Sequence, residues 1–187
     1  LVGPATLEAM DLLDTDVSEQ TYTTENGLVI HQHFLPRGEY LDGPTKKEYC
    51  FLHHTAGWHN PYKCIDSWGR DSRGRIATEF VLGGGSVKGN DDKYDGEMVQ
   101  AFPEGGYAWH LGKNGSQHMH KHSVGIEICN FGYVKNGKTY AGTTVAESQK
   151  VELPQAFRGY KTWHRYSDKQ IEATRKWILF IADRDNI

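Results

Sequence analysis

The sequence predicts a mixed α/β domain with a central β-sheet flanked by helices. Apolar runs at 48–54 and 123–134 are typical of buried strands, while 61–71 and 166–187 have the spacing of amphipathic helices. Strands separated by helices along a chain favour a sheet with helices packed on it. The length of 187 residues suits one domain of ordinary size.

Five segments are expected to form strands. The last one alternates most clearly, with Val124, Ile126 and Ile128 facing one way and Glu127 and Cys129 the other. The run at 48–54 is almost continuously apolar, which is typical of a strand covered on both faces. The five segments are 28–35, 48–54, 75–85, 96–102 and 123–134.

Two helices carry start signals. Asn60 followed by Pro61 is a favourable entry into a helix over 61–71. Ser167 and Gln170 form the S-x-x-Q pattern of a capping box at the start of the final helix. Its inward stripe is expected to consist of Ile171, Thr174, Ile178 and Ile181.

The chain divides into three parts. Residues 1–13 contain Gly3-Pro4 and then apolar residues at helical spacing, residues 14–27 are polar and rich in turn formers, and residues 28–187 hold the predicted α/β domain. We expect 14–27 to be a linker. Because the sequence starts without methionine and stops at Ile187 within a helical pattern, we also expect the domain to be truncated at its C-terminus.

Composition excludes several classes of partner. The formal net charge of −3 gives no electrostatic argument for nucleic acid or an acidic membrane. No apolar run approaches the roughly 20 residues that span a bilayer. The three cysteines are scattered without a C-x-x-C pair, which argues against a disulfide framework and against a cysteine-only zinc site.

Two residues are candidates for chemistry. His53 lies at the end of a buried strand just before a turn, where α/β proteins often place functional residues, although a lone histidine there can also be a core residue. Glu127 lies in an otherwise apolar strand beside Gly125, which allows a close approach. A buried carboxylate must be paired, hydrogen-bonded or functional; the alternative is an exposed face of an edge strand.

Further histidines cluster later in the chain. His110 follows Trp109, and His118, His120 and His122 alternate. On an extended segment these three would share a face, and such a pattern can bind zinc. The polar neighbours of this run favour a solvated loop instead.

Taken in order, the segments "HHTAG", "RGRIATEFVLGGG", "YAWHLG" and "HSVGIEICNFG" resemble the zinc-dependent N-acetylmuramoyl-L-alanine amidases, which include phage lysozyme-amidases and share the fold of peptidoglycan-recognition proteins. The resemblance covers residues 48–187. It implies hydrolysis of the amide that joins N-acetylmuramic acid to L-alanine of the peptidoglycan stem peptide, with Zn²⁺ as cofactor.

The resemblance also implies roles for individual residues. His53 matches the first zinc ligand, Glu127 the catalytic base, and His110 a histidine of the substrate cleft; Trp58 and Trp109 suit the same cleft. The other two zinc ligands are expected beyond Ile187. Some relatives carry a catalytic tyrosine where this chain has Thr78, so that role is not carried over.

A shorter resemblance concerns residues 1–13, which are similar to the end of a helical peptidoglycan-binding module. Together these features predict a peptidoglycan hydrolase that acts at the bacterial cell wall as a phage endolysin or a virion-associated protein. The alternatives are a non-catalytic peptidoglycan-recognition module and a structural component of a phage particle with the same fold.

Overall fold

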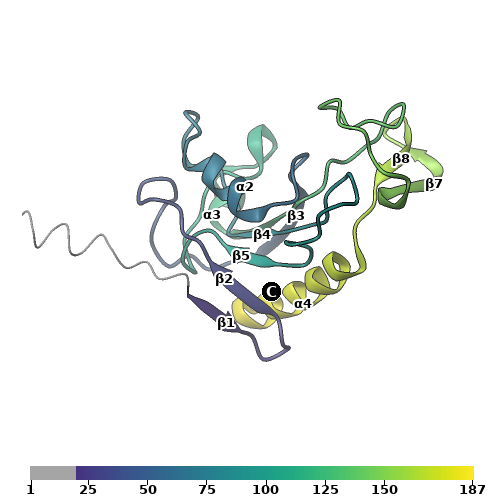
Figure 1. Ribbon diagram of the computed structural model, residues 1–187. Coiled ribbons are helices and arrows are strands. Elements are labelled where there is room, and N and C mark those ends of the chain that lie inside the picture. Colours follow the sequence, from purple (N-terminus) through teal and green to yellow (C-terminus); the bar gives the residue numbers. More distant parts are fainter. Residues whose placement is uncertain (1–19) are drawn as a thin grey trace, which may run out of the picture.

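Figure 1 shows the computed structural model, which describes residues 20–187. The predicted module end at 1–13 lies outside the described residues. A six-stranded mixed sheet has the spatial order β1-β2-β5-β4-β6-β3. Its strands are β1 (Thr21–Thr23), β2 (Val29–Gln32), β3 (Tyr49–His54), β4 (Phe80–Leu82), β5 (Met98–Gln100) and β6 (Ser123–Ile128).

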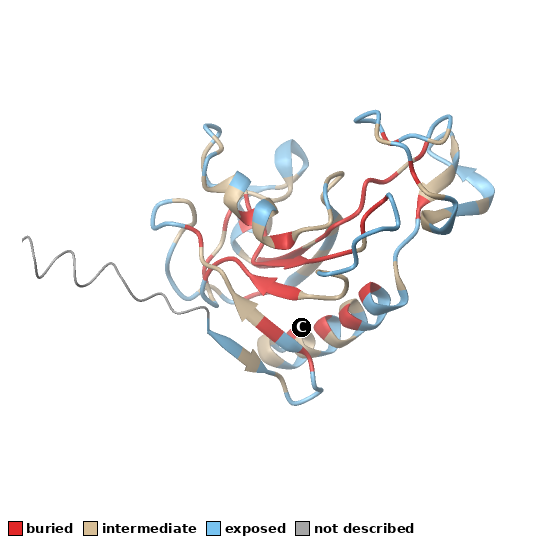
Figure 2. Cartoon of the chain, viewed as in Figure 1, coloured by how far each residue is buried: buried red, intermediate tan, exposed pale blue. Residues whose placement is uncertain are grey.

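Helices cover both faces of this sheet, as the sequence predicts (Figure 1). Helix α4 (Asp168–Asp185) packs Trp177 against Phe80 on one face, with ring centroids 5.7 Å apart. Helix α2 (Pro61–Trp68) packs Ile65 against the cluster that contains Val81 on the other face. Figure 2 shows buried residues concentrated in the central strands and along the sheet-facing side of α4.

The helix start signals are confirmed. The Asn60 side chain accepts a hydrogen bond from the backbone of Lys63, and Ser167 and Gln170 form the complete capping box. Within residues 20–187, no helix combines the length and the apolar character that crossing a membrane requires.

The inward stripe predicted for α4 is correct at Ile181 and wrong at Ile171 and Ile178. The buried residues are Gln170, Ala173, Trp177 and Ile181, whereas Ile171 is 59% exposed. The Gln170 side chain explains the difference at Ile171, because its Nε2 donates to the carbonyl oxygens of Gly83 (3.2 Å) and Cys129 (2.9 Å). A glutamine can therefore occupy the buried face at the start of the helix in place of Ile171.

Two strand predictions need correction. Residues Thr21–Thr23 pair with β2, so part of the expected linker 14–27 belongs to the sheet. Their Thr and Tyr side chains suit a strand, and the turn to β2 runs through Glu25 and Asn26 to Gly27, whose φ is +75°. Strand β3 is not covered on both faces, because Leu52 is 50% exposed. It also has a neighbouring strand on one side only, since it lies at the edge of the described sheet. An apolar run shows that the side chains are hydrophobic, but it does not show whether other elements cover both faces of the strand.

A separate β-hairpin lies between β6 and α4 in the sequence. It consists of β7 (Lys150–Phe157) and β8 (Tyr160–His164), follows the short 3₁₀ helix η2 (Glu147–Gln149), and forms its own two-stranded sheet. A small buried cluster of Val87, Phe131, Val134 and Val145 lies at its base. In Figure 1 the hairpin projects past the end of the main sheet.

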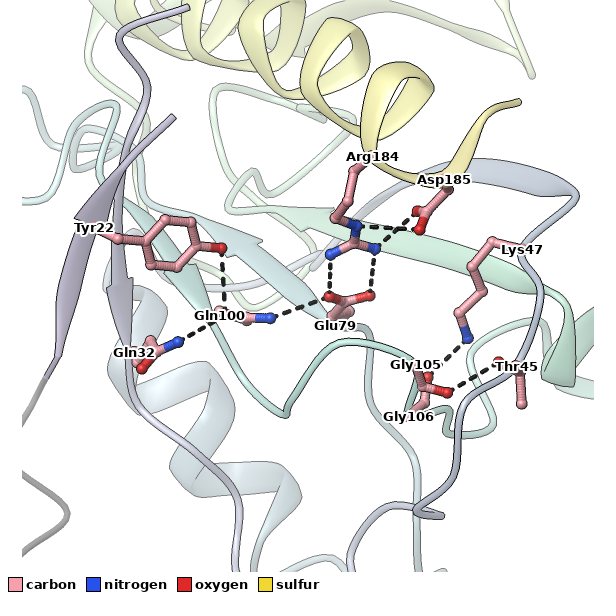
Figure 3. Close-up of polar contacts among 10 residues, drawn as sticks. All are labelled: Tyr22, Gln32, Thr45, Lys47, Glu79, Gln100, Gly105, Gly106, Arg184 and Asp185. Carbon is pink, nitrogen blue, oxygen red and sulfur yellow. Dashed lines mark hydrogen bonds and ion pairs between the residues drawn. The ribbon is translucent and has the colours of Figure 1, made fainter. Parts of the chain in front are cut away.

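A buried ion pair fixes the C-terminal end of α4 (Figure 3). Arg184 donates from Nη1 to Oε1 of Glu79 (2.7 Å) and from Nη2 to Oε2 (3.2 Å). Gln100 donates to the same carboxylate at 3.1 Å, and Asp185 also contacts Arg184. Burial lowers the pKa of Arg184, but Glu79 and Asp185 outweigh it and hold this pKa above its ordinary value. The pair joins α4 to the residue that precedes β4.

Candidate active site

His53 and Glu127 lie side by side at the C-terminal ends of two adjacent parallel strands. Strands β3 and β6 pair in a register that places His53 opposite Glu127 and Phe51 opposite Gly125. Partners in such a ladder project from the same face of the sheet. The carboxyl ends of strands are where open α/β sheets bind ligands.

A cavity of about 520 Å³ opens at this position. His53, His54 and Glu127 line it from the sheet, and Tyr166 and Ile171 line it from the start of α4. A smaller cavity of about 240 Å³ is lined by Glu127 and by Trp58. Glu127 thus lines both cavities.

One oxygen of the Glu127 carboxylate lacks a hydrogen-bond partner among residues 20–187. This oxygen, Oε2, is buried. Burial raises the pKa of Glu127 to about 7. The alternative of an exposed edge-strand residue is excluded, because β6 lies between β4 and β3. An unsatisfied buried oxygen of this kind requires a proton, a cation, a water molecule or a ligand.

His53 belongs to a chain of hydrogen bonds. Its Nε2 lies 3.0 Å from Nδ1 of His110, and Nε2 of His110 lies 2.7 Å from Oγ of the buried Ser123. Burial lowers the pKa of His53 and, with the further effect of His53, lowers that of His110 to about 3. Both rings are therefore neutral at pH 7, and both ring nitrogens of His110 are occupied.

Gly125 makes this chain possible. A Cβ atom at Gly125 would lie 2.8 Å from Nδ1 of His110 and 3.0 Å from the side chain of Thr78. The glycine lets the His110 ring lie against the strand beside His53. The close approach expected at Gly125 is confirmed, and the approaching group is the imidazole.

The other predicted residues divide between two regions. Trp58 is 56% exposed and packs edge-on against Phe131, with ring centroids 5.1 Å apart, beside the Glu127 cavity. Trp109 instead packs against His120 at 5.0 Å and lines a different cavity together with His110. The two tryptophans therefore do not share one cleft.

The run of three histidines forms the short helix α3 (Gln117–Lys121) and its end, so the expectation of a loop is wrong. Ser116 caps this helix by accepting a hydrogen bond from the Met119 backbone, a local signal that the sequence contained. His120 is buried and its Nδ1 accepts from the His110 backbone at 3.2 Å, while His118 and His122 stack on each other with ring centroids 4.3 Å apart. The three side chains do not join His53.

Comparison with known proteins decides the family. The profile of N-acetylmuramoyl-L-alanine amidases, Amidase_2, matches residues 43–187. The chain belongs to this family. The prediction of an amidase-type enzyme is thereby confirmed. No curated protein sequence matches the chain.

Two solved structures are similar to this amidase. The structure of PlyL has a TM-score of 0.51 and 14% identity, and the match covers 83% of this chain and 74% of PlyL. The AmiD amidase from E. coli, in complex with anhydro-N-acetylmuramic acid-L-Ala-D-γ-Glu-L-Lys, has a TM-score of 0.45 and 19% identity, with 78% of this chain and 46% of AmiD covered. PlyL supports the predicted mixed α/β fold.

The described part of the amidase fits a metal site only in part. His53 offers one neutral imidazole, and the orphan oxygen of Glu127 lies beside it. Across residues 20–187, however, no three His, Cys, Asp or Glu side chains converge as metal ligands. A catalytic zinc site needs three protein ligands, so these residues do not complete one.

Proposed function

We propose that this amidase hydrolyses the bond between N-acetylmuramic acid and L-alanine of peptidoglycan, with Glu127 as the catalytic carboxylate and His53 as a zinc ligand. The observation that carries the proposal is the orphan Oε2 of Glu127, placed opposite His53 at the ends of paired parallel strands. Family membership supplies the reaction class.

Glu127 suits a proton-transfer role. Its pKa of about 7 lies near the working pH, where a group can accept a proton and return it with comparable ease. Oε2 would take the proton of the attacking water and deliver it to the leaving nitrogen. Zinc, when bound, would supply a more acidic water and polarise the scissile carbonyl.

We assign His110 an orienting role in place of the predicted substrate contact. If Nε2 of His53 donates to Nδ1 of His110, then Nε2 of His110 donates to Ser123, and Nδ1 of His53 keeps its lone pair for a metal. Histidine ligands commonly donate their other ring N–H to such a partner, which fixes tautomer and orientation. Neither nitrogen of His110 is left for the substrate.

Trp58 remains the better candidate of the two tryptophans for substrate contact, because it is exposed beside the Glu127 cavity. We propose that the missing zinc ligands come from outside residues 20–187, since none completes the site within them. Action at the bacterial cell wall, as an endolysin or a virion-associated protein, rests on the ordered motifs of the sequence.

The test is the release of new L-alanine amino termini from purified sacculi in the presence of zinc, with Glu127→Gln as the matched control and a chelator as a second control. We expect release by the protein extended to include the missing zinc ligands, and loss of it in both controls. Release by Glu127→Gln at the wild-type rate would contradict the assignment.

The incomplete ligand set among the described residues favours one alternative, a recognition module that binds the wall without cleaving it. This alternative predicts that the protein sediments with sacculi but releases no new amino termini at saturating zinc.

A further inference from the structure

We propose that residues 132–165, called here the hairpin lobe, bind the glycan strand of peptidoglycan outside the cleavage site. The lobe comprises β7, β8 and the loops that join them to β6 and α4. The proposal rests on the proposed function for its choice of polymer. It adds a second binding surface to the amidase.

Four aromatic rings form a continuous cluster on the lobe. Tyr133 and Tyr160 stack with centroids 4.0 Å apart and an interplanar angle of 14°. Trp163 lies 5.5 Å from Phe157 and 6.5 Å from both tyrosines. None of the four belongs to a buried cluster of residues 20–187.

The cluster is open to solvent at Phe157, while its other three rings are half-buried. Phe157 is 55% exposed, and its neighbour in the ladder, Tyr160, is half-buried. In Figure 2 the hairpin consists mostly of exposed and half-buried residues. Exposed aromatic groups of this size mark interaction sites more often than chance placement.

The charge of the lobe differs from that of the rest of the chain. It contains six Lys or Arg and two Glu residues, a formal net charge of +4, within a chain whose net charge is −3. Five of these basic residues are exposed: Lys135, Lys138, Arg158, Lys161 and Arg165. Such a patch attracts a polyanion, and the stem peptides of peptidoglycan carry carboxylates.

The lobe is continuous with the site. A Cβ atom at Gly132 would lie 3.0 Å from Cε1 of His54, which lines the same cavity as Glu127. On the other side, Phe131 packs against Trp58. A polymer that lies across Glu127 therefore meets the lobe as it leaves the cavity.

Aromatic rings identify the glycan as the occupant. Pyranose rings present flat C–H faces that stack on aromatic side chains, whereas polyol-phosphate polymers of the wall present mainly charge. The basic residues alone would suit either polymer. The aromatic cluster favours the sugar strand, and the negative charge of the whole chain disfavours nucleic acid.

The first experiment measures sedimentation of the chain with insoluble sacculi in chelator, which prevents turnover. Phe157→Ala and the double variant Arg158→Gln/Lys161→Gln are compared with Tyr49→Ala and Lys113→Gln/Lys121→Gln, exposed residues of the same types outside the lobe. We expect Phe157→Ala to bind about tenfold more weakly, the usual effect of one stacked ring, the double variant to bind more weakly through its lost charges, and the controls to change less than about twofold.

A structural role for the rings is separated by the double variant, which keeps all four rings although it removes the contact of Arg158 with Phe157 (5.5 Å), and by near-ultraviolet circular dichroism of both variants. Wild-type binding by both lobe variants would overturn the proposal. Binding that disappears when sacculi are stripped of accessory anionic polymers would also overturn it, since those polymers would then be the partner.

Cleavage of a short soluble muramyl peptide is measured separately. A chain that binds sacculi through the lobe but cleaves no fragment would defeat the proposed function and leave the lobe proposal standing. A chain that cleaves fragments while its lobe variants bind sacculi normally would defeat the lobe proposal alone.

Discussion

Glu79, which is buried, and Glu127, which is half-buried, are two carboxylates at neighbouring strands with opposite environments. Glu79 precedes β4, is 1% exposed, and receives two hydrogen bonds from Arg184 and one from Gln100. Glu127 ends β6 with one buried oxygen that has no partner among residues 20–187. Only Glu127 faces a cavity lined by a second candidate residue, His53.

The contrast separates a structural acid from a reactive one. At Glu79 a cation and hydrogen bonds offset part of the lost hydration, although burial still raises the pKa of this carboxyl against the opposing effect of Arg184. Among the described residues Glu127 has no such cation beside it, so burial favours its protonated form and raises its pKa to about 7. Perturbed groups in a cleft are candidates for catalysis, whereas fully paired ones fix the fold.

The largest effect is expected at Arg184. Arg184→Met would leave Glu79 buried without its cation, and we expect a loss of about 3–5 kcal/mol in unfolding free energy, measured by urea denaturation. Replacing both partners, with Glu79→Leu in addition, should restore most of it. Arg175→Met, which breaks the exposed pair with Glu172, is the control and should cost far less. Equal losses at Arg175 and Arg184 would contradict the structural role.

Changing Glu79 and Glu127 separately to glutamine tests the difference between the two carboxylates directly. Glu127→Gln should lose at least about 10²-fold in turnover, the usual size for removal of an acid–base group, and lose no unfolding free energy. Glu79→Gln should lose stability. Amino-terminus release and urea denaturation measure the two properties. Unfolding of Glu127→Gln at the urea concentration that unfolds Glu79→Gln would make Glu127 structural.

A smaller effect is expected at His110. His110→Phe removes the partner of His53 while keeping a ring beside Phe51, and we expect zinc affinity to fall by about 10–100-fold, measured by competition with a chelating dye. His118→Phe, which changes an exposed histidine, is the control. Unchanged affinity in His110→Phe would remove the orienting role.

The last effect is a pH slope. Between the ordinary pKa of 4.5 and about 7, the folded chain holds a proton on Glu127 that the unfolded chain has released. Unfolding free energy should therefore fall as pH rises through this range, by at most about 1.4 kcal/mol per pH unit.

Buried His110 and His164, whose pKa values are lowered by burial, act in the opposite direction in wild type and variant alike. The difference between wild type and Glu127→Gln, measured in chelator, isolates Glu127. Parallel pH profiles for the two proteins would refute the raised pKa.

Local patterns predicted the central part of the fold. Alternation in 123–134 correctly placed Val124, Ile126 and Ile128 on the side of α4, and the caps Asn60 and Ser167 marked true helix starts. The prediction of His53 and Glu127 as site residues stays a prediction, but the structure does bring them together. The strand alternation and the helix caps could be predicted because each depends on residues that are close together in the sequence.

The errors have a common physical origin in long-range contacts. The buried face of α4 depends on a glutamine whose partners are Gly83 and Cys129, and the environment of His110 depends on Ser123. No spacing along the chain reports such contacts. The hairpin lobe was likewise missed, because its aromatic residues pair across the strands rather than alternate along one.

The parallel pairing of β3 with β6 has a consequence for folding. His53 and Glu127 are more than 70 positions apart in sequence and meet only when this pairing closes the intervening loop. Non-local strand pairing of this kind belongs to the slower class of folding reactions, in the range of milliseconds to seconds. During refolding, recovery of activity should therefore trail the formation of helices α2 and α4, and the catalytic pair reports completion of the sheet.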